Sequence, residues 1–90
     1  MNNLNERLRE LIDFSRMSNP KLEETTGIKR ESWSAMRNKR TRANEEHIES
    51  ISKIYPEFAY WLVTGETIES AGQISPDIEE SRRNLKTGTH

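Results

Sequence analysis

Apolar residues recur at helical spacing through the first two-thirds of the chain, and they predict a series of short helices. One buried helix face has the spacing i, i+4, i+7, i+8, and it is formed by Leu4, Leu8, Leu11 and Ile12. Asn2 or Asn3 can cap the start of this helix with a side-chain oxygen. The pattern therefore predicts a first helix over residues 4–14.

A second helix is predicted to begin at Ser18 or Asn19 and to end at Gly27. Pro20 suits its first turn, where the missing N–H costs nothing. Leu22 is its main apolar residue, and Gly27 suits the left-handed conformation that often ends a helix.

Ile28 follows directly and is predicted to turn inward, before a third helix begins near residue 29 or 30. Trp33 and Met36 lie three residues apart, so they share one helix face. We expect both to close the core with Ile28, which makes Trp33 a core residue and not a platform for stacking bases.

Two further helices are predicted before residue 66. Asn44 resembles an N-cap, with Glu45 and Glu46 placed where acids suit the helix dipole. Pro56 stops this fourth helix, and a short fifth helix follows over residues 57–64 with Gly65 as its stop. Inward-facing residues of the two helices are Ile48, Ile51, Ile54, Tyr55, Phe58, Trp61 and Leu62. Five helices with no strand pattern predict a compact all-α domain over residues 1–65.

Residues 66–90 contain few apolar side chains and are predicted to form an acidic linker and tail. Ser75, Pro76 and the acids that follow are typical of a helix start, so a sixth helix over residues 76–86 is expected. Ile78 and Leu85 lie on one stripe of it. Two apolar residues are too few to hold an isolated helix in water, so we expect the tail to dock on something or to fray.

Charge is distributed unevenly, although the net charge is only −1. Residues 29–42 hold six basic residues and one acid, a net charge of +5, whereas residues 43–81 hold nine acids and one lysine, a net charge of −8. A local basic patch can bind phosphate while the rest of the surface is repelled. The same run of charges is also compatible with an ordinary solvated face.

Several function classes find no support in the sequence. The chain has no cysteine and only two distant histidines, His47 and His90, so no metal site and no cofactor are expected. No glycine-rich phosphate loop and no nucleophile with a neighbouring base are present, so an enzyme is not expected. No apolar run is long enough to span a membrane, and the polar N-terminus is unlike a signal peptide. The expected compartment is the cytoplasm.

A recognisable combination is formed by Leu22, Gly27, Ile28, Trp33 and Met36, by the segment Asn38–Arg40, and by the segment YPEFAYWLVTGE at Tyr55–Glu66. With these features, residues 4–65 resemble the helix-turn-helix of Cro/cI-like regulators, the lambda-repressor-like or xenobiotic-response-element class of phages and bacteria. Two residues depart from the family pattern. Glu23 stands where a small residue is usual, so its carboxylate is expected to reach solvent or an arginine. Lys39 stands where glycine is usual, so the third helix is expected to run longer or to end differently.

The resemblance implies which residues contact DNA. Base-reading positions would fall on Arg30, Glu31, Ser34 and Ala35. Phosphate contacts would come from Ser18, Asn19, Arg37, Asn38, Lys39, Arg40 and Arg42. Each has a plainer alternative: Arg30 as a solvated side chain, for example, or Glu31 as an acid that suits the helix dipole.

The function that the sequence predicts is a sequence-specific regulator that binds double-stranded DNA, a homodimeric repressor on a palindromic operator. Candidate dimer residues are Phe58, Tyr60, Val63, Ile78 and Leu85. The alternative is an antitoxin-like or adaptor protein whose tail binds a protein partner, with DNA binding secondary. The acidic segment and the weak tail helix favour this alternative.

Overall fold

The chain folds as an all-α protein, as predicted. The computed structural model describes residues 3–87, in which the secondary structure is helical apart from one isolated bridge between Ile68 and Gln73. Its elements are α1 (Leu4–Ser15), α2 (Asn19–Thr26), α3 (Arg30–Arg37), α4 (Glu45–Ile54), the 3-10 helix η1 (Pro56–Phe58), α5 (Ala59–Thr64), the 3-10 helix η2 (Glu69–Ala71) and α6 (Pro76–Thr87).

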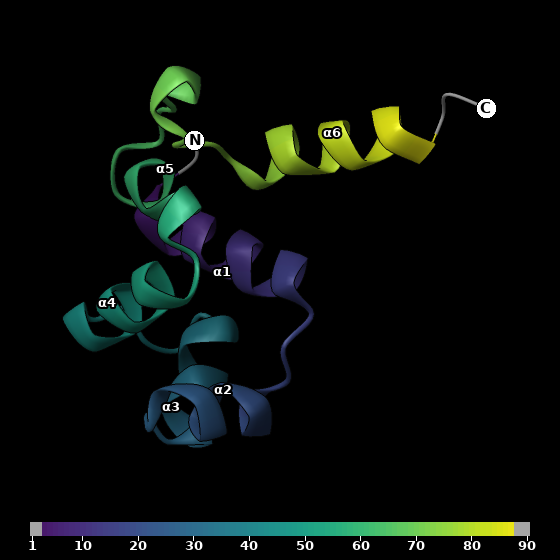
Figure 1. Cartoon of the computed structure of the whole chain (residues 1–90). Coiled ribbons are helices and arrows are strands. Elements are labelled where there is room, and N and C mark those ends of the chain that lie inside the picture. The colour runs from purple at the N-terminus through teal and green to yellow at the C-terminus, as the bar shows by residue number, and fades with distance from the viewer. Residues whose placement is uncertain (1–2, 88–90) are drawn as a thin grey trace.

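The helices form one body with a projecting arm. Helices α2 and α3 lie together at one end, α5 lies towards the other, and α1 and α4 run between them (Figure 1). Helix α5 packs against both α1 and α4. Helix α6 follows beyond α5 and its C-terminal end projects from the body (Figure 1).

The core is made by the side chains that the helical spacing predicts. Trp33, at 0% exposure, is a core residue and not a surface platform. The buried apolar residues are Leu8, Leu11, Ile12, Leu22, Trp33, Met36, Ile51, Phe58, Trp61, Leu62 and Ile74. Ile28 is half-buried and packs against this cluster, so the turn between α2 and α3 is anchored to the core.

Helix starts and ends follow the polar and glycine signals in the sequence. The side chains of Asn3, Ser18 and Asn44 each accept a hydrogen bond from a backbone N–H in the first turn of α1, α2 and α4. Gly27 and Gly65 end α2 and α5 in the left-handed region, with φ of 79° and 80°. The alternative cap for α1, Asn2, lies outside the described residues.

The core continues beyond residue 65, where we expected a linker to begin. Ile74 is 5% exposed and belongs to the core cluster, and its backbone N–H donates to the Glu57 carbonyl at 2.9 Å. The Gln73 side chain accepts from the Tyr60 N–H at 2.9 Å and donates to the Pro56 carbonyl at 3.0 Å. The segment after Gly65 therefore folds back over η1 and α5 and is part of the domain.

The sixth helix forms as predicted, but its two apolar residues do not act together. The Ser75 hydroxyl accepts from the Ile78 N–H at 3.2 Å and so caps α6. Ile78 is half-buried against the core, whereas Leu85 is 69% exposed. Arg83 lies 4.9 Å from the centre of the Phe14 ring, a cation–π contact with α1. Helix α6 is therefore held to the body at both Ile78 and Arg83, and part of the Ile78 side chain is used in an intramolecular contact.

Helices α1 and α5 are joined by a buried arginine. Arg7 is 7% exposed. Its Nε donates to the Leu62 carbonyl at 2.9 Å, and its Nη2 donates to the Val63 carbonyl at 3.1 Å. These carbonyls belong to the end of α5, where backbone acceptors lack partners within the helix. Arg7 therefore supplies the charge and the donors that this buried helix end needs.

Candidate nucleic-acid interface

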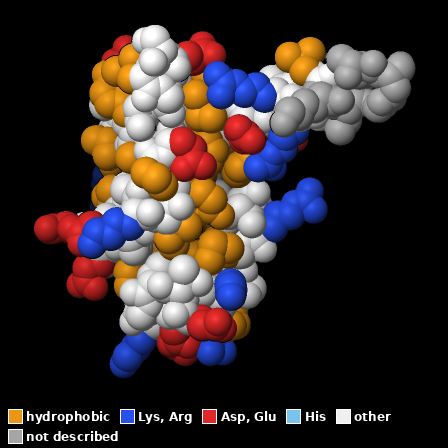
Figure 2. Space-filling view, viewed as in Figure 1, with side chains coloured by type: hydrophobic (Ala, Val, Ile, Leu, Met, Phe, Trp, Pro, Cys, Tyr) orange, Lys and Arg blue, Asp and Glu red, His pale blue; other side chains and the backbone are white. Residues whose placement is uncertain are grey.

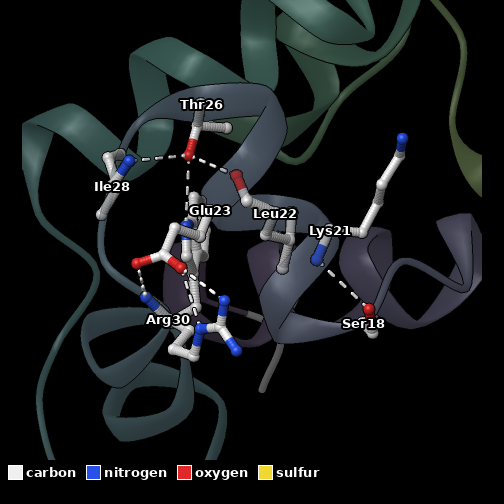
Figure 3. Close-up of polar contacts among 8 residues, drawn as sticks. Ser18, Lys21, Leu22, Glu23, Thr26, Ile28 and Arg30 are labelled. Atoms are coloured by element: carbon white, nitrogen blue, oxygen red, sulfur yellow. Dashed lines mark hydrogen bonds and ion pairs between the residues drawn. The ribbon is translucent and has the colours of Figure 1, made fainter.

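The turn between α2 and α3 is held by one threonine. The Thr26 hydroxyl donates to the Leu22 carbonyl at 2.6 Å, and it accepts from the Ile28 N–H at 3.1 Å and from the Trp33 indole at 3.3 Å (Figure 3). Thr26 thus links the last turn of α2, the connecting turn and the core of α3. Sequence reasoning assigned no role to it, because a threonine in a polar helix carries no distinctive pattern.

Helix α3 begins against the Glu23 carboxylate. Lys29, the N-cap residue, makes no side-chain capping bond. Glu23 Oε1 instead pairs with the Arg30 guanidinium, 2.8 Å from Nε and 2.8 Å from Nη2, and Glu23 Oε2 accepts from the Arg30 backbone N–H at 3.3 Å (Figure 3). The side-chain and backbone hydrogen bonds from Arg30 lower the pKa of Glu23. The Glu23 carboxylate was expected to reach either solvent or an arginine, and it binds the arginine.

Several predicted DNA contacts line one surface hollow of about 360 Å³. They come from the start of α2, the start of α3 and the segment after α3. The lining residues are Asn19, Pro20, Arg30, Glu31, Ser34 and Arg40. Charged side chains of both signs gather at this end of the molecule (Figure 2). Three predicted base-reading residues and two predicted phosphate-binding residues are thus brought to one concave surface.

Helix α3 ends in a Schellman motif with lysine in the position that usually holds glycine. Lys39 has φ 64°. Its N–H donates to the Met36 carbonyl at 3.2 Å, and the Arg40 N–H donates to the Ala35 carbonyl at 2.8 Å, the two bonds that define this motif. The helix therefore ends at Arg37 without a glycine, and exposed Asn38, Lys39, Arg40 and Arg42 follow it.

Replacing Lys39 with glycine is expected to stabilise the fold by about 1 kcal/mol, because only glycine adopts this backbone conformation without steric cost. The measurement is urea unfolding of the wild type, Lys39→Gly and Lys39→Ala. The alanine variant loses the same charge but keeps the backbone strain. Equal stability of the two variants would contradict this expectation.

The remaining predicted contact residues differ in their exposure and in the hydrogen bonds that they already make within the protein. Arg37 was expected to face outward and contact a phosphate, but its guanidinium faces inward. It donates to the Met17 carbonyl, to Asn19 Oδ1 and to Asp13 Oδ1, at 2.9–3.1 Å. It joins α1, α2 and α3 and does not face outward. Ala35 is half-buried. Ser18 Oγ already accepts from the Lys21 N–H at 3.2 Å.

A buried histidine joins α3 to α4. His47 is 1% exposed and its ring lies 4.5 Å from the Trp33 ring. Its Nδ1 accepts from the Asn44 backbone N–H at 3.2 Å, so the neutral ring carries its proton on Nε2 and donates it to the Ser32 hydroxyl, 2.9 Å away. The sequence alone indicated only an isolated histidine at position 47 and did not predict its hydrogen bond to Ser32.

Stability is expected to fall as the pH drops below about 6.5, the ordinary histidine pKa. Burial lowers the pKa of His47 in the folded protein, against a weaker opposing effect of Glu46. The unfolded chain therefore takes up the proton first, and stability present above this pH is lost as the pH falls towards the lowered pKa. Thermal unfolding from pH 8 to pH 5 measures this. If His47→Gln showed the same decline between pH 7 and pH 5.5, another group would be responsible.

The candidate dimer residues differ in how exposed their side chains are. Phe58 is 1% exposed, so it is a core residue and its assignment to a dimer surface is wrong. Tyr60 is 37% exposed and Val63 is 54% exposed, both on α5. Of the five candidates, Tyr60, Val63 and Leu85 are exposed and Ile78 is half-buried.

The described residues show no sign of a metal centre or of a membrane span. Within residues 3–87 no group of three or more histidine, cysteine or acidic side chains could hold a metal ion. In the same part of the chain, no helix has both the length and the apolar character needed to cross a bilayer.

The fold and the surface define the chain as a small all-helical protein that presents a short helix pair beside a basic segment. No protein-family model matches the sequence, and no curated protein matches it significantly. Among solved structures, Pf6r from the filamentous phage Pf6 of Pseudomonas aeruginosa PA01 matches with a TM-score of 0.83 and 34% sequence identity. The match covers 94% of this chain and 99% of Pf6r. The chain belongs to the same family as Pf6r.

Proposed function

We propose that the protein is a phage-type regulator of the Cro/cI-like helix-turn-helix class that binds double-stranded DNA sequence-specifically. The observation that carries this proposal is the hollow in which Arg30, Glu31 and Ser34 of α3 meet Asn19 of α2 and Arg40. Residues that the family resemblance assigns to bases and to phosphates thus share one surface. The family relationship to a filamentous-phage protein also supports a phage regulator.

In the proposed complex α3 enters the major groove, which is about 12 Å wide and admits one helix. Its first turn is the exposed part, so Arg30 and Glu31 face the base edges while Trp33 and Met36 hold the helix to the core. Backbone N–H groups at the start of α2 favour an anion, and they lie near the phosphates. Lys39, Arg40 and Arg42 contact the DNA backbone beyond α3.

A homodimer on a palindromic site is part of the proposal. One such domain makes few base contacts, and two copies separated by about one turn of DNA, roughly 34–36 Å, supply the missing affinity and specificity. The exposed apolar residues Tyr60 and Val63 on α5 are the candidate dimer surface.

A second candidate function is an antitoxin-like or adaptor protein. The observation that favours it is the α6 side chain of Leu85, which is 69% exposed. In that case a protein partner covers the tail, and DNA binding is secondary. Failure of the purified protein to enrich any DNA sequence would favour this candidate.

The leading proposal is tested by selecting bound duplexes from a random DNA pool with the full chain. We expect a symmetric motif. On the selected duplex, Arg30→Ala is expected to cost about 1–3 kcal/mol and to relax preference at one base pair, whereas Arg40→Ala weakens all duplexes alike and reduces the salt slope by about one. Equal losses on selected and random DNA for both variants would refute the assignment.

A further inference from the structure

We infer that Glu23 is a positioning residue that holds the Arg30 guanidinium so that its free edge reads a guanine, and that Glu23 thereby sets sequence preference without touching DNA. This inference rests on the proposed function and deepens it.

Both oxygens of the Glu23 carboxylate are engaged by the same residue, seven positions along the chain. Oε1 lies 2.8 Å from both Nε and Nη2 of Arg30, and Oε2 accepts from the Arg30 backbone N–H. The backbone bond fixes the carboxylate relative to the axis of α3. The two side-chain contacts, both to Oε1, then direct the Nε–Nη2 edge of the guanidinium towards the carboxylate (Figure 3).

The donors that remain on Arg30 suit a guanine. A guanidinium has five N–H groups in a rigid plane. Glu23 takes one from Nε and one from Nη2, which leaves the edge formed by Nη1 and the second N–H of Nη2. Two parallel donors on this edge match O6 and N7 of guanine in the major groove. Arg30 and its neighbours Glu31 and Ser34 line the same hollow, and in the proposed complex a base occupies this hollow.

Stability alone is a weak explanation for the pair. The side chains of Arg30 and Glu23 are 51% and 33% exposed, and exposed ion pairs contribute little to folding. A carboxylate in this place also opposes the binding of any DNA, because it repels phosphate. The arrangement therefore weakens affinity for DNA in general, and its benefit is a fixed orientation for Arg30.

The helix offers a matched control in Glu24. This residue is one position away, is also ion-paired, with Lys21 at 3.4 Å, and its side chain is 74% exposed. Glu24→Gln removes the same charge from α2 as Glu23→Gln but leaves Arg30 untouched. Both variants are expected to bind random duplexes slightly more tightly than the wild type, because each removes one repulsive charge.

The experiment uses the duplex that the wild-type full chain selects from a random pool, together with versions substituted at each base pair. Arg30→Ala identifies the base pair that Arg30 reads, which we expect to be a guanine. At that base pair, Glu23→Gln is expected to reduce discrimination by about fivefold or more, while Glu24→Gln leaves it unchanged. Combined with Arg30→Ala, Glu23→Gln should add no further loss, since the two residues act as one unit.

Arg30→Lys provides a second route to the same question. It keeps the charge and leaves Glu23 in place but lacks the planar edge, so it should lose the guanine preference while the salt slope stays as in the wild type. Unchanged discrimination in Glu23→Gln, alongside a clear loss in Arg30→Ala, would overturn the inference and leave the proposed function standing. Recovery of no preferred duplex by the wild type would overturn the proposed function, and the inference with it.

Discussion

Replacing Arg7 with methionine is expected to lower the free energy of unfolding by about 3 kcal/mol. The side chain is nearly fully buried, and its Nε and Nη2 satisfy the carbonyls of Leu62 and Val63 at the end of α5. Hydrogen bonds from a charged group are worth about 1.5–3 kcal/mol each, and losing one partner leaves the other desolvated. Methionine fills much of the volume but donates no hydrogen bond.

Urea unfolding followed by circular dichroism measures this effect. Arg9→Met is the matched control, because Arg9 lies on the same helix and is only partly buried. Its effect should stay within about 0.5 kcal/mol, as for most surface substitutions. A similar stability for Arg7→Met and Arg9→Met would show that the link between α1 and α5 is unimportant for the fold.

Replacing Ile74 with alanine is expected to cost about 2–5 kcal/mol, the usual range for truncating a buried isoleucine. Ile74 is 5% exposed and packs in the same cluster as Phe58, Trp61 and Leu62. The substitution leaves a cavity at the place where the segment after Gly65 returns to the body. The measurement is again the free energy of unfolding, which reports on the whole domain because the core is continuous.

Ile68→Ala is the matched comparison for Ile74→Ala. It removes the same atoms from the same segment, but Ile68 is 42% exposed, so the loss should be only about 1 kcal/mol. If both variants lost the same small amount of stability, residues 66–75 would not be part of the folded core. The large difference that we expect would mean that a fragment ending at Gly65 lacks part of its own core.

The first five helices could be predicted because their signals are local. Helical spacing of Leu8, Leu11 and Ile12, the caps at Ser18 and Asn44, and the stops at Gly27 and Gly65 all act within a few residues of the chain. The anchoring of Ile74 could not be predicted in the same way. Ile68 and Ile74 are too few to reveal a periodicity in this polar segment, and the burial of Ile74 depends on long-range contacts: its own N–H donates to the Glu57 carbonyl, and the Gln73 side chain donates to the Pro56 carbonyl.

The candidate interface was predictable in part, for the same reason. Arg30, Glu31 and Ser34 share one helix face, so their meeting in one hollow follows from their spacing. Arg37 has the same residue type and a similar position, but its acceptors on Met17, Asn19 and Asp13 come from other elements. Spacing along α3 alone therefore cannot tell a side chain that faces out from one that bridges three helices.

The ion pair between Glu23 and Arg30 also has a consequence for the thermodynamics of binding. A free arginine side chain has about 2 kcal/mol of rotamer entropy, part of which is lost whenever a ligand fixes it. Because Glu23 and the start of α3 already restrict Arg30, that loss occurs largely when the chain folds. Any ligand that contacts Arg30 in this conformation meets a side chain that is already ordered, so its binding carries a smaller entropic penalty.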